Sequence, residues 1–315
     1  MPMPGQHLLT AIRRARRPDG FIVVAVLWIL GALATLASIY AVYVVDTAVA
    51  FGVHDDRLKA EGMVKAGVEL TSYLITAKPE QRETQGAFVL RMGQANVAVD
   101  FRSEAARIDL NAAPKELLAG LFTAFGASPA NAETYADRVI GWRKPPAEAG
   151  ADPESNAYRT AGLRYPPRGG NFAHVGELSL VMGLPPLLVE RVQPFVTVYS
   201  GQAQVNVFEA APEVLAALPG MTPDRLPAIL AQRRAGPQNA QAVLAALGAA
   251  QASATAEGGK TIRVHVRIGF DNGRRMSSEV VILTLDEGTD PYYVLSWHDE
   301  LDDSVPDARA RTVLR

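Results

Sequence analysis

The chain contains no cysteine, which excludes disulfide bridges, thiolate nucleophiles and cysteine-based metal sites. Its five histidines lie in unrelated contexts without the spacing of metal ligands, and one of them, His265, alternates with valines in an expected strand. No serine stands in a nucleophile-elbow pattern. These absences indicate that the protein is not an enzyme, and no cofactor is expected.

Charge is missing from one long stretch, residues 21–45. A helix needs roughly 20 apolar residues to cross the hydrocarbon core of a membrane, so this stretch can span one. The preceding segment holds four arginines: Arg13, Arg14, Arg16 and Arg17. Because such clusters stay on the cytoplasmic side, we expect one membrane span with the rest of the chain on the far side.

The basic segment ends in Gly20, and Phe21 opens the apolar run. This order resembles the type IV prepilin class, in which a membrane peptidase cuts after the Gly and the new first residue is N-methylated. The resemblance implies cleavage between Gly20 and Phe21. Pilins carry Glu at the fifth mature position, where it pairs with a neighbouring subunit's N-terminus, and here that position is Ala25. Because a buried unpaired carboxylate is costly, its absence suits a subunit at a filament tip.

Beyond the span, the helix is expected to continue to about Ala77. Its predicted buried face consists of Leu58, Met63, Gly67, Leu70 and Leu74. Strands are predicted at residues 87–90, 97–101 and 108–110, and around an Asn-Gly turn at 261–270, 276–285 and 292–297. Both sets should form one antiparallel sheet on the helix. Residues 249–259 are expected to be a linker, and the polar tail from Asp299 to be loose.

An internal repeat interrupts the strands, because Leu110-Asn111-Ala112-Ala113-Pro114 returns before a second apolar helix as Val205-Asn206 followed by Ala210-Ala211-Pro212. In each copy the Asn is expected to cap a helix and the Pro to open it. The two units resemble helix-hairpin-helix, or SAM-like, repeats, whose nucleic-acid-binding members offer Gly-x-Gly amides to phosphate.

The hairpins of this chain, at Gly126, Gly183 and Gly220, lack the second Gly. The chain has 31 basic and 33 acidic residues, and four of the basic ones precede the membrane span, so the remainder is net acidic. An acidic chain is unsuited to a polyanion. No nucleic-acid partner is therefore expected.

Further pieces follow in order: Trp142-Arg143 before an acidic loop, Asn171-Phe172 leading to Glu177, and a closing strand at 293–297. With the leader, Ala25 and the repeats, they resemble the type II secretion minor pseudopilin K family. The resemblance implies an α+β fold, a long transmembrane and spine helix on a small antiparallel pilin-like sheet, with an inserted all-helical domain of two helix-hairpin-helix repeats. The expected segments are a leader at 1–20, the span at 21–45, spine and first strands at 46–109, repeats at 110–200 and 201–255, and closing strands and tail at 256–315.

The resemblance also implies a function in protein export across the outer membrane, in initiating and capping the pseudopilus. The expected partners are minor pseudopilins I and J, the prepilin peptidase, the major pseudopilin filament and the inner membrane. The expected topology is single-pass in the inner membrane, with a cytoplasmic N-terminus and a periplasmic C-terminal domain. Two alternatives stay open: a type IV pilus minor pilin, and a membrane-anchored helix-hairpin-helix DNA receptor.

Members of the K family often carry carboxylates for calcium in the loop that corresponds to residues 144–177. Here Lys144, Pro145 and Pro146 stand where acids are expected, and the remaining candidate ligands are Glu148, Asp152, Glu154 and Glu177. Calcium takes six to eight oxygen ligands. We therefore expect a solvated acidic loop that binds calcium weakly or not at all.

Overall fold

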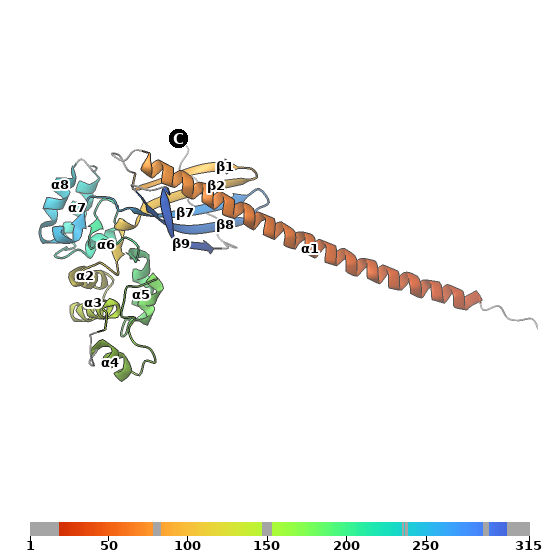
Figure 1. Ribbon diagram of the computed structural model, residues 1–315, viewed down its shortest axis with the longest axis horizontal. Helices are drawn as coiled ribbons and strands as arrows, with labels where there is room; N and C mark the ends of the chain where they lie inside the picture. Colours follow the sequence, from red (N-terminus) through yellow and green to blue (C-terminus); the bar gives the residue numbers. More distant parts are fainter. Residues whose placement is uncertain are drawn as a thin grey trace, which may run out of the picture. The chain divides into compact units, whose positions relative to one another are not determined.

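The computed structural model describes residues 19–77, 83–146, 153–234, 236, 239–285 and 290–300 (Figure 1). The chain divides into two compact units, with the boundary between Lys59 and Ala60 inside helix α1 (Asp19–Thr76). Of the expected leader, residues 1–18 lie outside the described residues, and its last two positions belong to α1.

The first part of α1 is the expected membrane span. Residues Phe21–Thr47 have a mean hydropathy of 2.5 and none of them is buried, and this is the one helix in the described part of the chain long and apolar enough to cross a membrane. Thr35 and Ser38 donate their hydroxyl hydrogens to carbonyls one turn earlier, at 2.8 and 2.9 Å. Polar side chains satisfied inside the helix are compatible with a lipid surrounding.

The last turns of α1 pack on the sheet through a face that agrees only in part with the predicted one: Gly67 is buried and Met63 packs against the core as expected, but the predicted leucines are not buried. Leu58 and Leu74 are 55% and 38% exposed, whereas the buried side chains include Ala60, Val64, Val68 and Ile75. A Cβ added at Gly67 would lie only 3.1 Å from Val99 Cγ2, so the helix approaches the sheet closely at this glycine.

The sheet has the order β1-β2-β7-β8-β9, and every neighbouring pair is antiparallel. Its strands are β1 (Gln85–Met92), β2 (Ala95–Ser103), β7 (Thr261–Phe270), β8 (Arg275–Thr284) and β9 (Tyr292–Glu300). Val97, Val99, Val264 and Val266 form part of the core with α1. The pairing of β2 with β7 confirms one sheet built from both ends of the chain.

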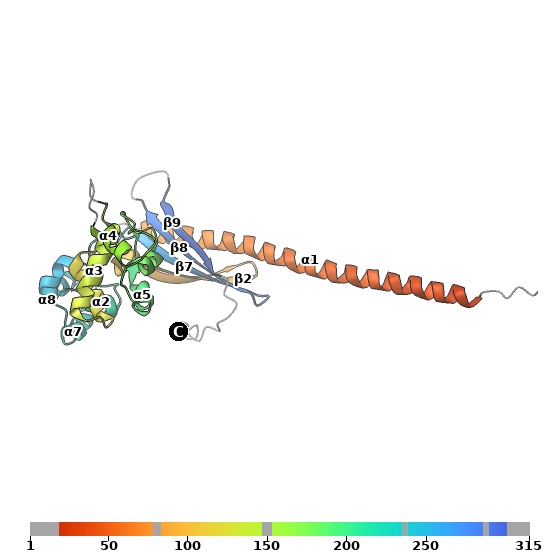
Figure 2. The same ribbon diagram turned by 90° about the horizontal axis from the view of Figure 1, so that it is seen from below.

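All remaining elements lie between β2 and β7, and Figure 2 shows the helices gathered beyond one end of the strands. The first group is η2 (Glu104–Ala106), β3 (Ile108–Asp109), α2 (Lys115–Ala124), α3 (Pro129–Arg143), α4 (Pro153–Thr160), η3 (Val175–Leu180), α5 (Pro186–Val192), η4 (Gln193–Phe195) and β4 (Val196–Thr197). The second is β5 (Val205–Asn206), α6 (Pro212–Ala216), α7 (Arg225–Arg233), α8 (Ala240–Leu247), η6 (Gly248–Ser253) and β6 (Ala254–Thr255). One core joins both groups, with Leu117, Leu121, Val139, Val214 and Leu215 among its buried members.

Three sequence expectations are wrong, two in this insertion and one at the end of β9. The strand predicted at 108–110 does not join the main sheet, because β3 pairs in parallel with β4 instead. The predicted linker at 249–259 contains η6 and β6, and Ala250 and Ala254 are buried there, because β6 pairs with β5. Asp299 belongs to β9 rather than to a loose tail, since it lies opposite Ser278, and residues 301–315 lie outside the described part.

Candidate functional site

The expected processing residues all lie at the start of α1. Gly20 and Phe21 are consecutive helical residues, and the Phe21 side chain is 74% exposed. Ala25 lies one turn further along the same helix and is half-buried. The cleavage between Gly20 and Phe21 stays a prediction. The structure adds that the cut would fall within the first turn of α1.

The two repeats begin with the same local structure, although not in the predicted register. Asp109 Oδ1 accepts from the amide of Asn111 at 2.7 Å, and Asn206 Oδ1 accepts from the amide of Phe208 at 2.9 Å. Both are Asx turns, in which a short polar side chain bonds the backbone two residues later. Asn206 therefore corresponds to Asp109 and not to Asn111.

The predicted caps are accordingly wrong. The residue before α2 is Pro114 and the residue before α6 is Ala211, and neither helix start has a side-chain cap. Asn111 instead bonds both backbone groups of Phe172, accepting from its amide at 2.7 Å and donating to its carbonyl at 3.1 Å. Its role is to attach the segment around Phe172 to the first repeat.

Two arginines that sequence reasoning missed close the equivalent loops. Arg143 donates to the carbonyls of Leu110 and Ala113, at 2.5 and 2.8 Å. Arg233 donates to the carbonyls of Val207 and Ala210, at 3.4 and 2.5 Å. Burial lowers the pKa of both guanidinium groups. One sequence signal could have found them, because an arginine is the last residue of the second helix in each repeat.

The three hairpin glycines have left-handed backbone conformations, with φ of 97° at Gly126, 83° at Gly183 and 70° at Gly220. Glycine adopts such values without the strain that a Cβ imposes, which explains why each hairpin has one. The structure thus places a tight turn at each predicted position.

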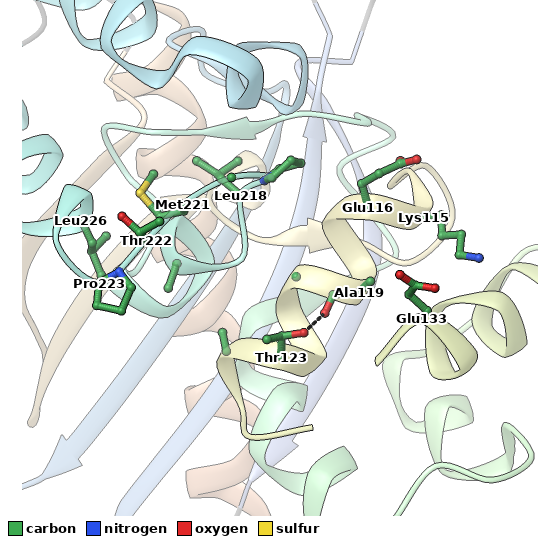
Figure 3. A pocket seen from close by; sticks show the side chains of 15 residues that line it. Lys115, Glu116, Ala119, Thr123, Glu133, Leu218, Met221, Thr222, Pro223 and Leu226 are labelled. Atoms are coloured by element: carbon green, nitrogen blue, oxygen red, sulfur yellow. Dashed lines mark hydrogen bonds between the residues drawn. The ribbon is translucent and has the colours of Figure 1, made fainter. Parts of the chain in front are cut away.

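A groove of about 830 Å³ lies between α2 and the hairpin of the second repeat. Figure 3 shows Lys115, Glu116 and Glu133 grouped at one side, with Met221 and Leu226 at the other. Lys115 is the one basic residue among those that line the groove, and Asp137 binds its ammonium at 2.8 Å. A groove with two carboxylates and one neutralised cation is unsuited to a phosphate backbone.

The acidic loop differs from expectation. Glu154 binds Arg138 at 2.9 Å, and Glu177 accepts from Arg168 at 2.7 Å and from the Trp142 indole at 3.2 Å. The two carboxylate side chains are only 20% and 16% exposed, so the prediction that they are solvated is wrong. Their arginine partners occupy the place that a cation would take.

Two more candidate calcium ligands, Glu148 and Asp152, lie outside the described residues. Within the part of the chain that the structure describes, no three His, Cys, Asp or Glu side chains are arranged to hold a metal ion.

One buried carboxyl lies at the start of the second repeat. Glu209 is 7% exposed, its Oε1 accepts from Asn206 Nδ2 at 3.0 Å, and its Oε2 lacks a hydrogen-bond partner among the described residues. Burial raises the pKa of Glu209 to about 7, against the smaller lowering effects of Thr84 and Arg102.

Comparison with known proteins agrees with this architecture. Residues 96–201 match the family model described as type II secretion system (T2SS), protein K. Among solved structures, the chain is similar to one in the crystal structure of the GspK-GspI-GspJ complex from the type 2 secretion system of enterotoxigenic Escherichia coli. The two chains are 15% identical with a TM-score of 0.60, and the alignment covers 78% of this chain and 98% of that chain. No curated protein sequence matches the chain.

The family match begins in β2 and ends soon after β4, so it includes the first repeat and the Asn111 contact with Phe172. The structural match shows the same fold over most of the chain. Through residues 96–201 the chain carries a type II secretion protein K domain, and the resemblance drawn from its sequence is confirmed.

Proposed function

We propose that the protein is a minor pseudopilin at the tip of the type II secretion pseudopilus, acting in its initiation and capping. The observation that carries this proposal is that one helix, α1, includes both the apolar span and the residues that pack on the sheet. Such a helix can lie in the membrane before assembly and pack among the helices of a filament afterwards. The protein K domain at residues 96–201 favours type II secretion over a type IV pilus.

Ala25 supports a position at the tip. After cleavage behind Gly20 it would be the fifth mature residue, where a subunit inside the filament needs a carboxylate for its neighbour's amine. A subunit with no neighbour above it needs none. The insertion between Ser103 and Thr261 adds further bulk to the sheet, which would hinder the addition of another subunit.

The proposed topology places the arginine-rich N-terminus in the cytoplasm and the sheet with its insertion in the periplasm. The proposed partners are minor pseudopilins I and J, the major pseudopilin filament, the prepilin peptidase and the inner membrane. The helical repeats, which resemble SAM-like units, serve protein contacts in this proposal. A DNA receptor is disfavoured because the groove beside the Gly220 hairpin offers no free cation among its lining residues.

The decisive experiment is mass spectrometry of the full chain from membranes of cells that have a prepilin peptidase and the I and J subunits. We expect a mature form that begins at N-methylated Phe21 and copurifies with both subunits. Gly20→Val should remain uncut, whereas the same change at Gly31, in the same helix, should be processed normally. An intact N-terminus in the unaltered protein would overturn the proposal, and processing without copurification would point to a different filament.

A further inference from the structure

A second hollow lies on the sheet face that points away from α1. It has a volume of about 470 Å³ and is lined by β1, β2, η2 and β7. Three arginines converge on it. Arg102 and Arg263 lie directly opposite each other on β2 and β7, and Arg107 follows η2. Like charges placed opposite each other in a sheet are unfavourable unless other groups compensate them.

Arg263 is fully compensated. Its Nε donates to Glu104 Oε1 at 2.6 Å, its Nη2 donates to Glu104 Oε2 at 2.9 Å, and its Nη1 donates to Glu279. Glu104 also accepts from the Thr197 hydroxyl. Each oxygen of this carboxylate therefore already accepts a hydrogen bond from a residue other than Arg107.

Arg107 forms one long ion pair, with Glu104. Its Nη1 lies 3.8 Å from Glu104 Oε1, beyond hydrogen-bonding distance, although its side chain is only 27% exposed. Burial lowers the pKa of Arg107, and the charges of Arg263 and Arg102 lower it further, against the raising effects of Glu104 and Glu279. Its guanidinium is thus a half-buried cation that has a long ion pair with Glu104 and no side-chain hydrogen bond to the described residues.

Arg102 is exposed, and its guanidinium has no hydrogen bond or ion pair among the described residues, although its charge acts on Glu209, against the larger effect of burial that raises the pKa of that carboxyl. Asp100, two residues before Arg102 on β2, binds Arg267 at 3.0 Å, and Glu279 accepts from Arg263. The carboxylates around the hollow are therefore neutralised by other partners. The guanidinium groups of Arg102 and Arg107 therefore have N–H donors available for a ligand.

We propose that this hollow binds an oxyanion, a phosphate or carboxylate group, held by the guanidinium groups of Arg102 and Arg107. Guanidinium groups bind such oxyanions through paired N–H donors, and charge-assisted bonds of this kind are the strong ones. Arg263 positions the Glu104 carboxylate through two hydrogen bonds, which leaves Glu104 Oε1 3.8 Å from Arg107. The site is independent of the proposed role in secretion, because it depends on contacts inside the sheet and the start of the insertion.

The test is titration calorimetry of the full chain in detergent micelles, with inorganic phosphate and succinate as separate probes in chloride buffer of matched ionic strength. We expect binding that the double variant Arg102→Gln/Arg107→Gln weakens by at least about tenfold. The matched control is Arg159→Gln on α4, which does not line the hollow and should bind like the unaltered protein. If phosphate binds more tightly, the group that the site recognises is a phosphate. If succinate binds more tightly, that group is a carboxylate.

Thermal unfolding separates a binding role from a structural one. In chloride alone, Arg107→Gln should melt close to the unaltered protein, because the cation that it removes has no side-chain hydrogen bond and only a long ion pair with Glu104. The rise in melting temperature with phosphate or succinate should disappear in this variant. Failure of both anions to bind, or equal binding by the double variant, would overturn the proposal.

Discussion

Arg143 and Arg233 make the same pair of contacts in different repeats. Each guanidinium donates to the first and fourth carbonyls after an Asx-turn residue, which is Asp109 in one repeat and Asn206 in the other. The amide after each short strand also has an equivalent partner, since Leu110 donates to Thr197 and Val207 to Thr255. The sequence repeat is therefore also a repeat of hydrogen bonds.

The first prediction follows from these contacts. Arg143→Gln should lower the free energy of unfolding by about 3 kcal/mol, because it leaves two carbonyls without their charged donor. Arg143→Lys should recover little, since an ammonium cannot reproduce the planar fork. Urea unfolding of the full chain in micelles measures both. Arg159→Gln, on the exposed α4, is the control and should stay within about 0.5 kcal/mol. Equal stability of Arg143→Gln and the control would show that the contact contributes nothing.

The second prediction concerns the contact between the repeats. A Cβ added at Gly120 of α2 would lie 1.9 Å from the carbonyl oxygen of Ala217, after α6. Gly120→Ala should therefore destabilise the chain by about 1 to 3 kcal/mol, as overpacking does. Gly62→Ala, in α1 with no atom within 4 Å of its added Cβ, should instead stabilise by up to about 1 kcal/mol. Thermal unfolding compares them, and a stabilising Gly120→Ala would refute the close approach.

The expectations that proved correct rest on local patterns. The bounds predicted for β7 agree with the structure, because alternation before an Asn-Gly turn is a local pattern. The pairing of β3 with β4 was not predicted, because the two strands lie far apart in the sequence. The buried face of α1 was predicted only in part, for a similar reason. Gly67 was expected on it, but the sheet also covers Ala60 and Val64, whereas Leu58 and Leu74 are exposed.

The candidate sites also divide into those that a local sequence pattern indicates and those that depend on contacts in the folded chain. The prepilin-like order around Gly20 is contiguous, so a cleavage site could be predicted from the sequence, and it stays a prediction. The ion-pair partners of Glu154 and Glu177 could not be predicted from the sequence, because these contacts depend on how α3 and the segment around Arg168 fold beside the loop. The hollow around Arg107 likewise brings together β2, η2 and β7, which are adjacent only in the folded chain.

The third prediction is a pH dependence from Glu209. Burial raises its pKa from 4.5 to about 7, so between these values the folded chain binds a proton that the unfolded chain has lost. Stability should therefore fall as the pH rises through this window, by about 3 kcal/mol in total from this group. Glu209→Gln should remove that fall and stabilise the chain above pH 7 while changing little below pH 4.5. Urea unfolding across this range is the measurement.

The matched control for Glu209 is Glu213→Gln, which changes an exposed carboxylate in the first turn of α6. It should keep the slope of the unaltered protein. If Glu209→Gln also keeps that slope, the carboxyl does not titrate in the folded chain as its burial implies.

The fourth prediction concerns calcium. Arg138 and Arg168 already neutralise Glu154 and Glu177, so a cation at this loop would have to displace them. A site with a micromolar dissociation constant would add about 4 kcal/mol of stability at millimolar calcium. For a chain of this size that would raise the melting temperature by roughly 10 °C. We expect calcium to change the melting temperature by no more than magnesium does at the same concentration. Arg168→Gln gives the more discriminating test, because it removes the cation that binds Glu177 Oε1. A calcium-specific rise in this variant alone would show that the arginine excludes the metal, whereas a rise of several degrees in the unaltered protein would contradict the prediction.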